Sequence, residues 1–184
     1  MILQHPQERI LQTFNYNGVK IDLTEWTATI WCGKLGFAAT PEDEPDIEEV
    51  MQKFLSLDIP ASLNAGRENG WDVCISLNYL SHERPHGVMF GFLVGKEQQP
   101  AGYDILKFPA SLYMRIPLCS QTSRALGFAP WHGGIPPYEW IGEYLASKYG
   151  YQYGDSNLPI LEYYGYYNKF SYKFCYLYVP VMKS

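Results

Sequence analysis

A tyrosine-rich window near the end of the chain is the strongest candidate for a binding or catalytic site. Residues 163–178 hold seven Tyr and two Phe. Side chains alternate between the two faces of a strand, so a strand here puts Tyr176 and Tyr178 on one face and places Leu177 and Val179 on the other. The Leu/Val face is the natural core face beneath helices. The tyrosine face must then cover another layer of the protein or line a cleft.

Glu162 lies in the middle of the preceding apolar strand and introduces a carboxylate beside these rings. Burying a carboxylate without a partner costs several kcal/mol, so Glu162 must be exposed, hydrogen-bonded or open to a cation. An acid in an aromatic box suits an organic cation, because the carboxylate pairs with the charge and the rings add cation–π contacts. We therefore predict a partly buried Glu162 in a ligand site, with a solvent-facing Glu162 and packing tyrosines as the alternatives. The residues expected to bind the ligand are Glu162, Tyr164, Tyr176, Tyr178, Trp140 and Tyr113.

Two halves of the chain show the same predicted order of elements, strand–helix–strand–strand, which would position these residues. The tetrapeptide LGFA occurs at 35–38 and again at 126–129, an offset of 91 residues. In the first half, β-branched and aromatic residues predict strands at 19–31, 71–80 and 88–94, around a helix at 47–57.

The second half repeats this order, with predicted strands at 110–118, 159–167 and 170–181 and a helix at 137–149. Residues 1–18 are expected to form an arm or a short strand, and residues 96–109 to connect the halves. This order favours an α+β fold, with one antiparallel sheet and the helices on one face. We therefore predict a single domain over residues 1–184, built from duplicated modules at about 19–95 and 105–181.

The composition excludes several classes of protein. The chain of 184 residues carries 14 Lys and Arg against 19 Asp and Glu, a net charge of −5, and so lacks the basic surface that nucleic-acid binding needs. It has no run of about 20 apolar residues and no signal-peptide pattern. Cys32, Cys74, Cys119 and Cys175 have no metal-binding or redox spacing. We expect no nucleic-acid or membrane binding, no cofactor and no metal, and four free thiols in a cytoplasmic protein.

Four stretches of the second half carry a resemblance to a known family. They are 136–145 (PPYEWIGEYL), 149–151 (YGY), 159–164 (PILEYY) and 176–181 (YLYVPV). This pattern resembles the GyrI-like family, which includes the effector-binding domains of AraC-type and MerR-type multidrug regulators. The resemblance implies a duplicated strand–helix–strand–strand fold with a ligand cleft between the halves. It also implies that Glu162 matches the family's cleft glutamate, which contacts cationic or polar ligands.

Three functions stay open at this point. The first is a stand-alone binding protein for a small hydrophobic or cationic molecule, for which transcription regulation would need a separate DNA-binding partner. The second, which the resemblance to stand-alone relatives implies, is a hydrolase of reactive electrophilic, cyclopropane-bearing toxins in which Glu162 activates a water. The third is an interaction module that inhibits a topoisomerase as its protein partner.

Overall fold

The computed structural model describes residues 7–58, 72–79, 81–94, 101–119, 122, 125–126, 138–164 and 175–184. Its strands are β1 (Glu8–Tyr16), β2 (Val19–Trp26), β3 (Thr29–Phe37), β4 (Val73–Leu77), β5 (Gly87–Val94), β6 (Asp104–Phe108), β7 (Ser111–Leu118), β8 (Tyr151–Tyr153), β9 (Ile160–Tyr163) and β10 (Cys175–Lys183). Its helices are the α-helix α1 (Ile47–Leu55) and the π-helix η1 (Trp140–Leu145), which is the middle of a helical segment from 138 to 147. None of the helices in these residues combines the length and the apolar character needed to span a membrane.

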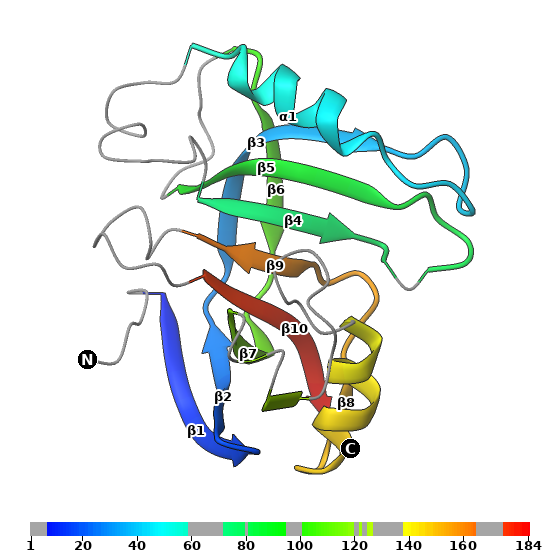
Figure 1. Ribbon diagram of the computed structural model, residues 1–184. Coiled ribbons are helices and arrows are strands. Elements are labelled where there is room, and N and C mark those ends of the chain that lie inside the picture. The colour runs from blue at the N-terminus through cyan, green and yellow to red at the C-terminus, as the bar shows by residue number, and fades with distance from the viewer. Residues whose placement is uncertain are drawn as a thin grey trace.

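The strands form one antiparallel sheet (Figure 1). Their order is β1-β2-β7-β10-β9-β4-β5-β3-β6, and β8 pairs with β10. The fold is therefore α+β with one antiparallel sheet, as the sequence predicts. At the centre of the sheet β9 lies beside β4. On one side of this centre follow β10 and β7, like β9 from the second half of the chain, and on the other side follow β5 and β3, like β4 from the first half. The superposition of the two halves as duplicated modules stays a prediction.

A row of directly opposite residues crosses the four central strands. Phe90 on β5 lies opposite Cys74 on β4, which lies opposite Glu162 on β9. Glu162 in turn lies opposite Leu177 on β10. Opposite residues of paired strands share a face of the sheet. Because Phe90 packs in the core with α1 residues and Leu177 in the core with η1 residues, both helices cover the same face.

The helices begin and pack as their local sequence predicts. The Asp46 carboxylate caps α1 by accepting a hydrogen bond from the Glu49 N–H at 2.9 Å. Phe54 of α1 is fully buried in the core that includes β3 and β5 residues. Ile141 and Leu145, four residues apart in η1, are equally buried in the core formed with β10. Observed strands overlap the expected ranges 71–80, 88–94, 110–118, 159–167 and 170–181, and observed helices overlap 47–57 and 137–149. Residues 165–174 of the last two expected strands lie outside the described residues.

The prediction of a single strand at 19–31 is wrong, because the structure has two strands, β2 and β3, separated at residues 27–28. β2 pairs with β1 and β7, whereas β3 pairs with β5 and β6. β2 and β3 are therefore joined by two residues although they lie far apart in the strand order. The sheet must curve to bring them this close together. Trp26 and Trp31 pack at this connection, with ring centroids 6.0 Å apart, in the core on the face away from the helices.

Three further strands form where the sequence pattern has no clear period. β1 covers half of residues 1–18, where an arm or a short strand is expected, and β6 lies in residues 96–109, which are expected only to connect the halves. β8 is a short strand beside the end of β10. These segments are strands because each forms backbone hydrogen bonds with a partner strand. Such pairing cannot be predicted from the alternation of apolar and polar residues within the segment itself. The turn expected at 168–169 lies outside the described residues.

The repeated tetrapeptide LGFA starts in different elements. Leu35 lies in β3, whereas Leu126 lies in a helical turn, and residues 127–129 lie outside the described residues. The offset of 91 residues relates Ile47, the first residue of α1, to Tyr138, which lies in the second helical segment. The equivalence of the two helices stays a prediction.

Candidate functional site

Glu162 lies at the centre of the sheet, where the two halves of the chain meet. Its strand β9 pairs with β4 of the first half and β10 of the second. The cross-strand row places its side chain on the face that the helices cover. Figure 1 shows β9 and β4 running between α1 and the helical segment around η1. The carboxylate therefore lies on the part of the sheet between the two helices.

Two phenols hold the Glu162 carboxylate. Tyr138 donates its hydroxyl to Oε1 at 2.5 Å, and Tyr164 donates to Oε2 at 2.7 Å. Tyr138 comes from the first turn of the helical segment, and Tyr164 directly follows β9. Hydrogen bonds to an ionised group are about twice as strong as neutral ones. Glu162 is partly buried, and its two hydrogen bonds provide the partners that such a carboxylate requires.

Two cysteine thiols flank the carboxylate on the same face of the sheet. Cys74 lies directly opposite Glu162 on β4, and Cys175 lies two residues before Leu177 on β10. Burial raises the pKa of both thiols, and the nearby Glu162 charge raises it further. Both cysteines are free. They therefore surround Glu162 with neutral, polarisable groups rather than with thiolates.

The negative charge of Glu162 has no basic partner in the described part of the chain, where no Lys or Arg forms an ion pair with it. Burial and the Glu162 charge also raise the pKa of the Tyr138 and Tyr164 phenols. Both phenols therefore remain protonated at neutral pH. The described groups around Glu162 are thus neutral donors that stabilise its charge without cancelling it.

A second group of polar aromatic residues extends from Tyr138 toward α1. The Tyr79 ring packs edge-on against Tyr138, with centroids 4.9 Å apart, and His86 packs edge-on against Tyr79 at 5.2 Å. His86 Nδ1 lies 2.8 Å from Glu44 Oε2. Burial, followed by the charge of Glu139 and a hydrogen bond to it, raises the pKa of Tyr79 to about 12. A row of three rings, Tyr138, Tyr79 and His86, therefore connects the carboxylates of Glu162 and Glu44.

Sequence reasoning found Glu162 and Tyr164 but missed Tyr138. A signal for it exists, because Tyr138 lies three residues before Ile141 and seven before Leu145, the spacing of one helix face. Both of those residues are buried against the sheet. The phenol of Tyr138 therefore had to point toward the sheet as well. The sheet residue that Tyr138 contacts depends on the register of the strands, which the sequence pattern does not give.

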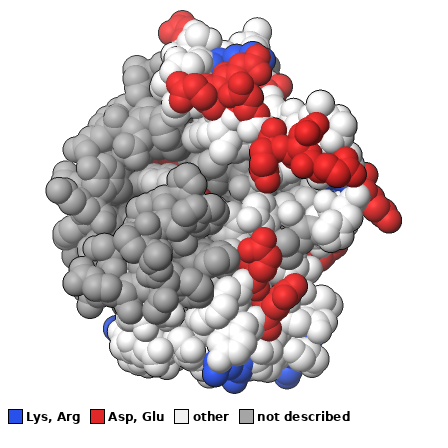
Figure 2. Space-filling model, turned by 45° about the vertical axis from the view of Figure 1, so that its right-hand side comes forward, with Lys and Arg blue, Asp and Glu red and all other residues white. Residues whose placement is uncertain are grey.

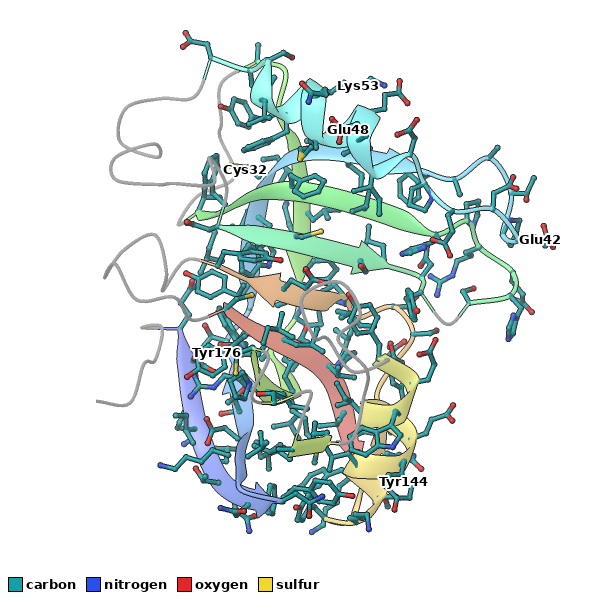
Figure 3. The ribbon with its side chains drawn as sticks, in the orientation of Figure 1. Cys32, Glu42, Glu48, Lys53, Tyr144 and Tyr176 are labelled. Carbon is teal, nitrogen blue, oxygen red and sulfur yellow. The ribbon has the colours of Figure 1, made fainter. Side chains whose placement is uncertain are left out.

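Tyr176, Tyr178 and Tyr113 lie on the opposite face of the sheet from Glu162. Tyr178 is fully buried in the core there, with its ring 5.4 Å from Trp26 and 6.2 Å from Tyr113. The expectation that these tyrosines surround Glu162 is therefore wrong, because the residue of β10 opposite Glu162 is Leu177. The tyrosine face of β10 packs in a core whose other residues lie on β2, β3, β4, β5, β7 and β9 of the same sheet. Figure 3 shows Tyr176 beside β2, away from the helix that carries Tyr144.

Tyr176 contributes to a buried charged cluster on that opposite face. The guanidinium of Arg115 lies 4.4 Å from the centroid of the Tyr176 ring. Arg115 also pairs with Asp22 at 2.6 Å and with Glu8 at 3.2 Å. These contacts join β1, β2, β7 and β10, so the cluster ties the N-terminal strand to the sheet.

Trp140 belongs to a third group of rings. Its ring lies 5.9 Å from Tyr16 of β1 and 5.4 Å from Tyr144 of η1. Of the six residues expected to bind a ligand, the structure joins Glu162 and Tyr164 through a hydrogen bond and packs Tyr113 against Tyr178 on the other face. Tyr138 is added to Glu162 and Tyr164 by its own hydrogen bond to the carboxylate.

The surface that carries α1 is acidic. Figure 2 shows clusters of Asp and Glu side chains there, with few Lys or Arg among them. They include Glu48 and Glu49 in the first turn of α1. A surface of one charge sign raises the local concentration of oppositely charged ligands. This face therefore attracts cations toward the helices.

No protein-family model and no curated protein matches the chain. Solved structures do resemble it. The structure of SAV2435 bound to tetraphenylphosphonium has a TM-score of 0.57 and 13% identity, over 88% of this chain and 93% of that one. A Staphylococcus aureus MU50 protein assigned to bacterial transcription regulation has a TM-score of 0.52 and 15% identity, over 88% and 97%.

A Vibrio cholerae integron cassette protein has a TM-score of 0.50 and 14% identity, over 89% of this chain and 95% of that one. At these identities the likeness shows a shared fold. It is consistent with the GyrI-like fold that the C-terminal stretches of the sequence resemble.

Proposed function

We propose that the chain is a binding protein for small hydrophobic, aromatic or cationic molecules, with Glu162 as the ionic anchor of the site. The observation that carries this proposal is a partly buried carboxylate at the join of the two halves, held by two phenols. In the described part of the chain it has no basic partner. A ligand that brings a positive charge would supply that partner.

The surroundings of Glu162 favour an organic cation over a metal ion. Calcium and magnesium need six or more oxygen ligands, whereas two phenols hydrogen-bond to Glu162. Among the described residues, no group of three or more His, Cys, Asp or Glu side chains is arranged to hold a metal ion. Phenol rings attract organic cations through their faces. Polarisable sulfur atoms provide apolar walls that adapt to ligands of different shape. The site therefore suits a lipophilic cation whose charge is shielded by carbon.

The fold comparison supports this class of ligand by analogy. SAV2435, which shares the fold, has been solved with tetraphenylphosphonium, a lipophilic cation. Fold alone does not carry function, so the proposal depends on the chemistry around Glu162. A ligand cleft between the halves, implied by the GyrI-like resemblance, is part of the same proposal.

Calorimetric titration with tetraphenylphosphonium and with neutral triphenylphosphine oxide tests the proposal. In Glu162→Gln the phosphonium should bind about 30- to 150-fold more weakly, because it loses a Coulomb attraction of about 2–3 kcal/mol, the value for unit charges about 6–8 Å apart at an effective dielectric constant of about 20. The neutral compound should lose much less, because ring contacts remain. Glu143→Gln, which neutralises an exposed carboxylate of η1, is the matched control and should leave both affinities unchanged. Equal losses for the two compounds in Glu162→Gln would refute the ionic anchor.

A hydrolase that uses Glu162 is the second candidate. The hydrogen bond from Tyr138 places a proton donor directly beside a carboxylate that could accept a proton from water. Turnover decides between the two functions. A binding protein returns an electrophilic, cyclopropane-bearing compound unchanged after incubation, whereas a hydrolase yields its water adduct and loses this activity in Glu162→Gln.

A further inference from the structure

Three adjoining aromatic rings lie beside η1, two of them under the ammonium of a lysine, in a group that contains neither Glu162 nor its hydrogen-bond donors. The Trp140 ring lies 5.9 Å from Tyr16 and 5.4 Å from Tyr144. The ammonium of Lys148 lies 5.5 Å from the centroid of Tyr16 and 4.8 Å from that of Tyr144. Both distances are within the range of about 6 Å in which a cation is attracted by a ring face.

The three rings come from two elements that tertiary contacts hold together. Tyr16 is the last residue of β1, whereas Trp140 and Tyr144 lie in η1. Phe14 of β1 stacks on Tyr149 at a centroid distance of 4.1 Å, which fixes this end of β1 against the helix end. The rings are therefore set in place by the fold rather than by neighbouring positions in the sequence. A ring group that is built before a ligand arrives loses little entropy on binding.

Solvent reaches this group of rings from outside. Tyr144 is 48% exposed, and Figure 3 shows it at the outer side of its helix. The Tyr144 side chain, followed by Tyr16, raises the pKa of Lys148, and the Lys148 ammonium lies over both of these rings. Its ammonium is therefore the cation that these rings hold in the absence of another one.

We infer that Tyr16, Trp140 and Tyr144 form a second binding site, for a small quaternary ammonium group, in which the Lys148 ammonium is the resident cation. A quaternary ammonium is more weakly hydrated than the primary ammonium of lysine, so it loses less on entering a ring cage. Its methyl groups also contact several rings at once. Lys148 then has to move aside, which its exposure and long flexible side chain permit. This inference does not depend on Glu162 binding any ligand.

The test uses the full chain, choline chloride, and 3,3-dimethyl-1-butanol, the neutral isostere of choline. Binding is followed by NMR shifts of the Tyr144 and Trp140 rings. Lys148→Gln removes the resident cation and should bind choline at least about fivefold more tightly than the natural chain. Tyr144→Ala removes an exposed wall and should abolish the choline-dependent shift at Trp140. The neutral isostere should bind much more weakly than choline to every variant.

Two controls make the result specific. Lys53→Gln removes one positive charge from α1, where Lys53 pairs with Glu49, and should leave choline affinity unchanged. Glu162→Gln should leave the shifts of Tyr144 and Trp140 unchanged. The inference is overturned if Lys148→Gln gains no more than Lys53→Gln, or if the isostere binds as well as choline. It is also overturned if Glu162→Gln removes the shifts, because the probe would then report on the Glu162 site.

Discussion

Removing the Tyr138 hydroxyl is the most informative single change at the Glu162 site. Tyr138→Phe keeps the ring but deletes the donor to Oε1, leaving Glu162 with the bond from Tyr164. A hydrogen bond to a charged group contributes about 1.5–3 kcal/mol. Because Glu162 is only partly buried, water can replace part of the lost interaction. We therefore expect a loss of about 1.5 kcal/mol, or about 3–6 °C in Tm for a chain of this size.

The same change should strengthen cation binding. The Tyr138 hydroxyl stabilises the carboxylate in the unliganded protein, so without it the carboxylate gains more from a ligand charge. We expect tetraphenylphosphonium to bind Tyr138→Phe more tightly, by at most about tenfold, since tenfold corresponds to 1.4 kcal/mol. Neutral triphenylphosphine oxide should bind with unchanged affinity. Tyr103→Phe, which removes a hydroxyl that donates to the Asp58 carbonyl rather than to Glu162, is the matched control for loss of a phenol hydroxyl.

A double-mutant cycle measured by urea unfolding isolates the Tyr138–Glu162 interaction. In the Glu162→Gln background the hydrogen bond is neutral, so Tyr138→Phe should cost only about 0.5 kcal/mol and the coupling should be about 1 kcal/mol. An equal cost in both backgrounds would refute the charge-assisted bond. Weaker binding of both ligands to Tyr138→Phe would show instead that the hydroxyl contacts the ligand itself.

Three further predictions concern other parts of the structure. Arg115→Met leaves Glu8 and Asp22 buried without their cation and should lower the free energy of unfolding by about 3–5 kcal/mol. The control Arg9→Met breaks an exposed pair and should lower it by under about 1 kcal/mol. Similar urea midpoints for the two variants would contradict this prediction. Gly142→Ala places a Cβ 2.2 Å from Tyr153 Cδ2 and should cost about 1–3 kcal/mol, a loss that Tyr153→Ala in the same chain should partly restore in thermal melts. Because the pKa of Cys74 and Cys175 is raised, both thiols should react with iodoacetamide at pH 8 far more slowly than they do in the unfolded protein. Mass spectrometry of the labelled peptides measures the two rates. A fast reaction of either cysteine would mean that this cysteine is exposed as a thiolate.

Much of the fold could be predicted from local signals. Asp46 caps a helix whose buried residues recur at helical spacing, and the proline pair before Tyr138 precedes the second helical segment. Both signals, the spacing of apolar residues and the helix cap, depend only on residues that are close together in the sequence. β6 and β8 could not be found in this way, because each is a strand only through its pairing with β3 or β10.

The sequence alone determined that a carboxylate, Glu162, lies in an apolar strand next to tyrosines, and that Tyr176 and Tyr178 share a face opposite Leu177. Only the tertiary structure decided which of those two faces Glu162 would join. Strand period assigns side chains to faces within one strand, whereas the register between strands depends on hydrogen bonds between residues far apart in the chain. That register sets Glu162 opposite Leu177, so its hydrogen-bond donors are Tyr138 and Tyr164, while the tyrosines of β10 pack with Trp26 and Arg115 on the other face.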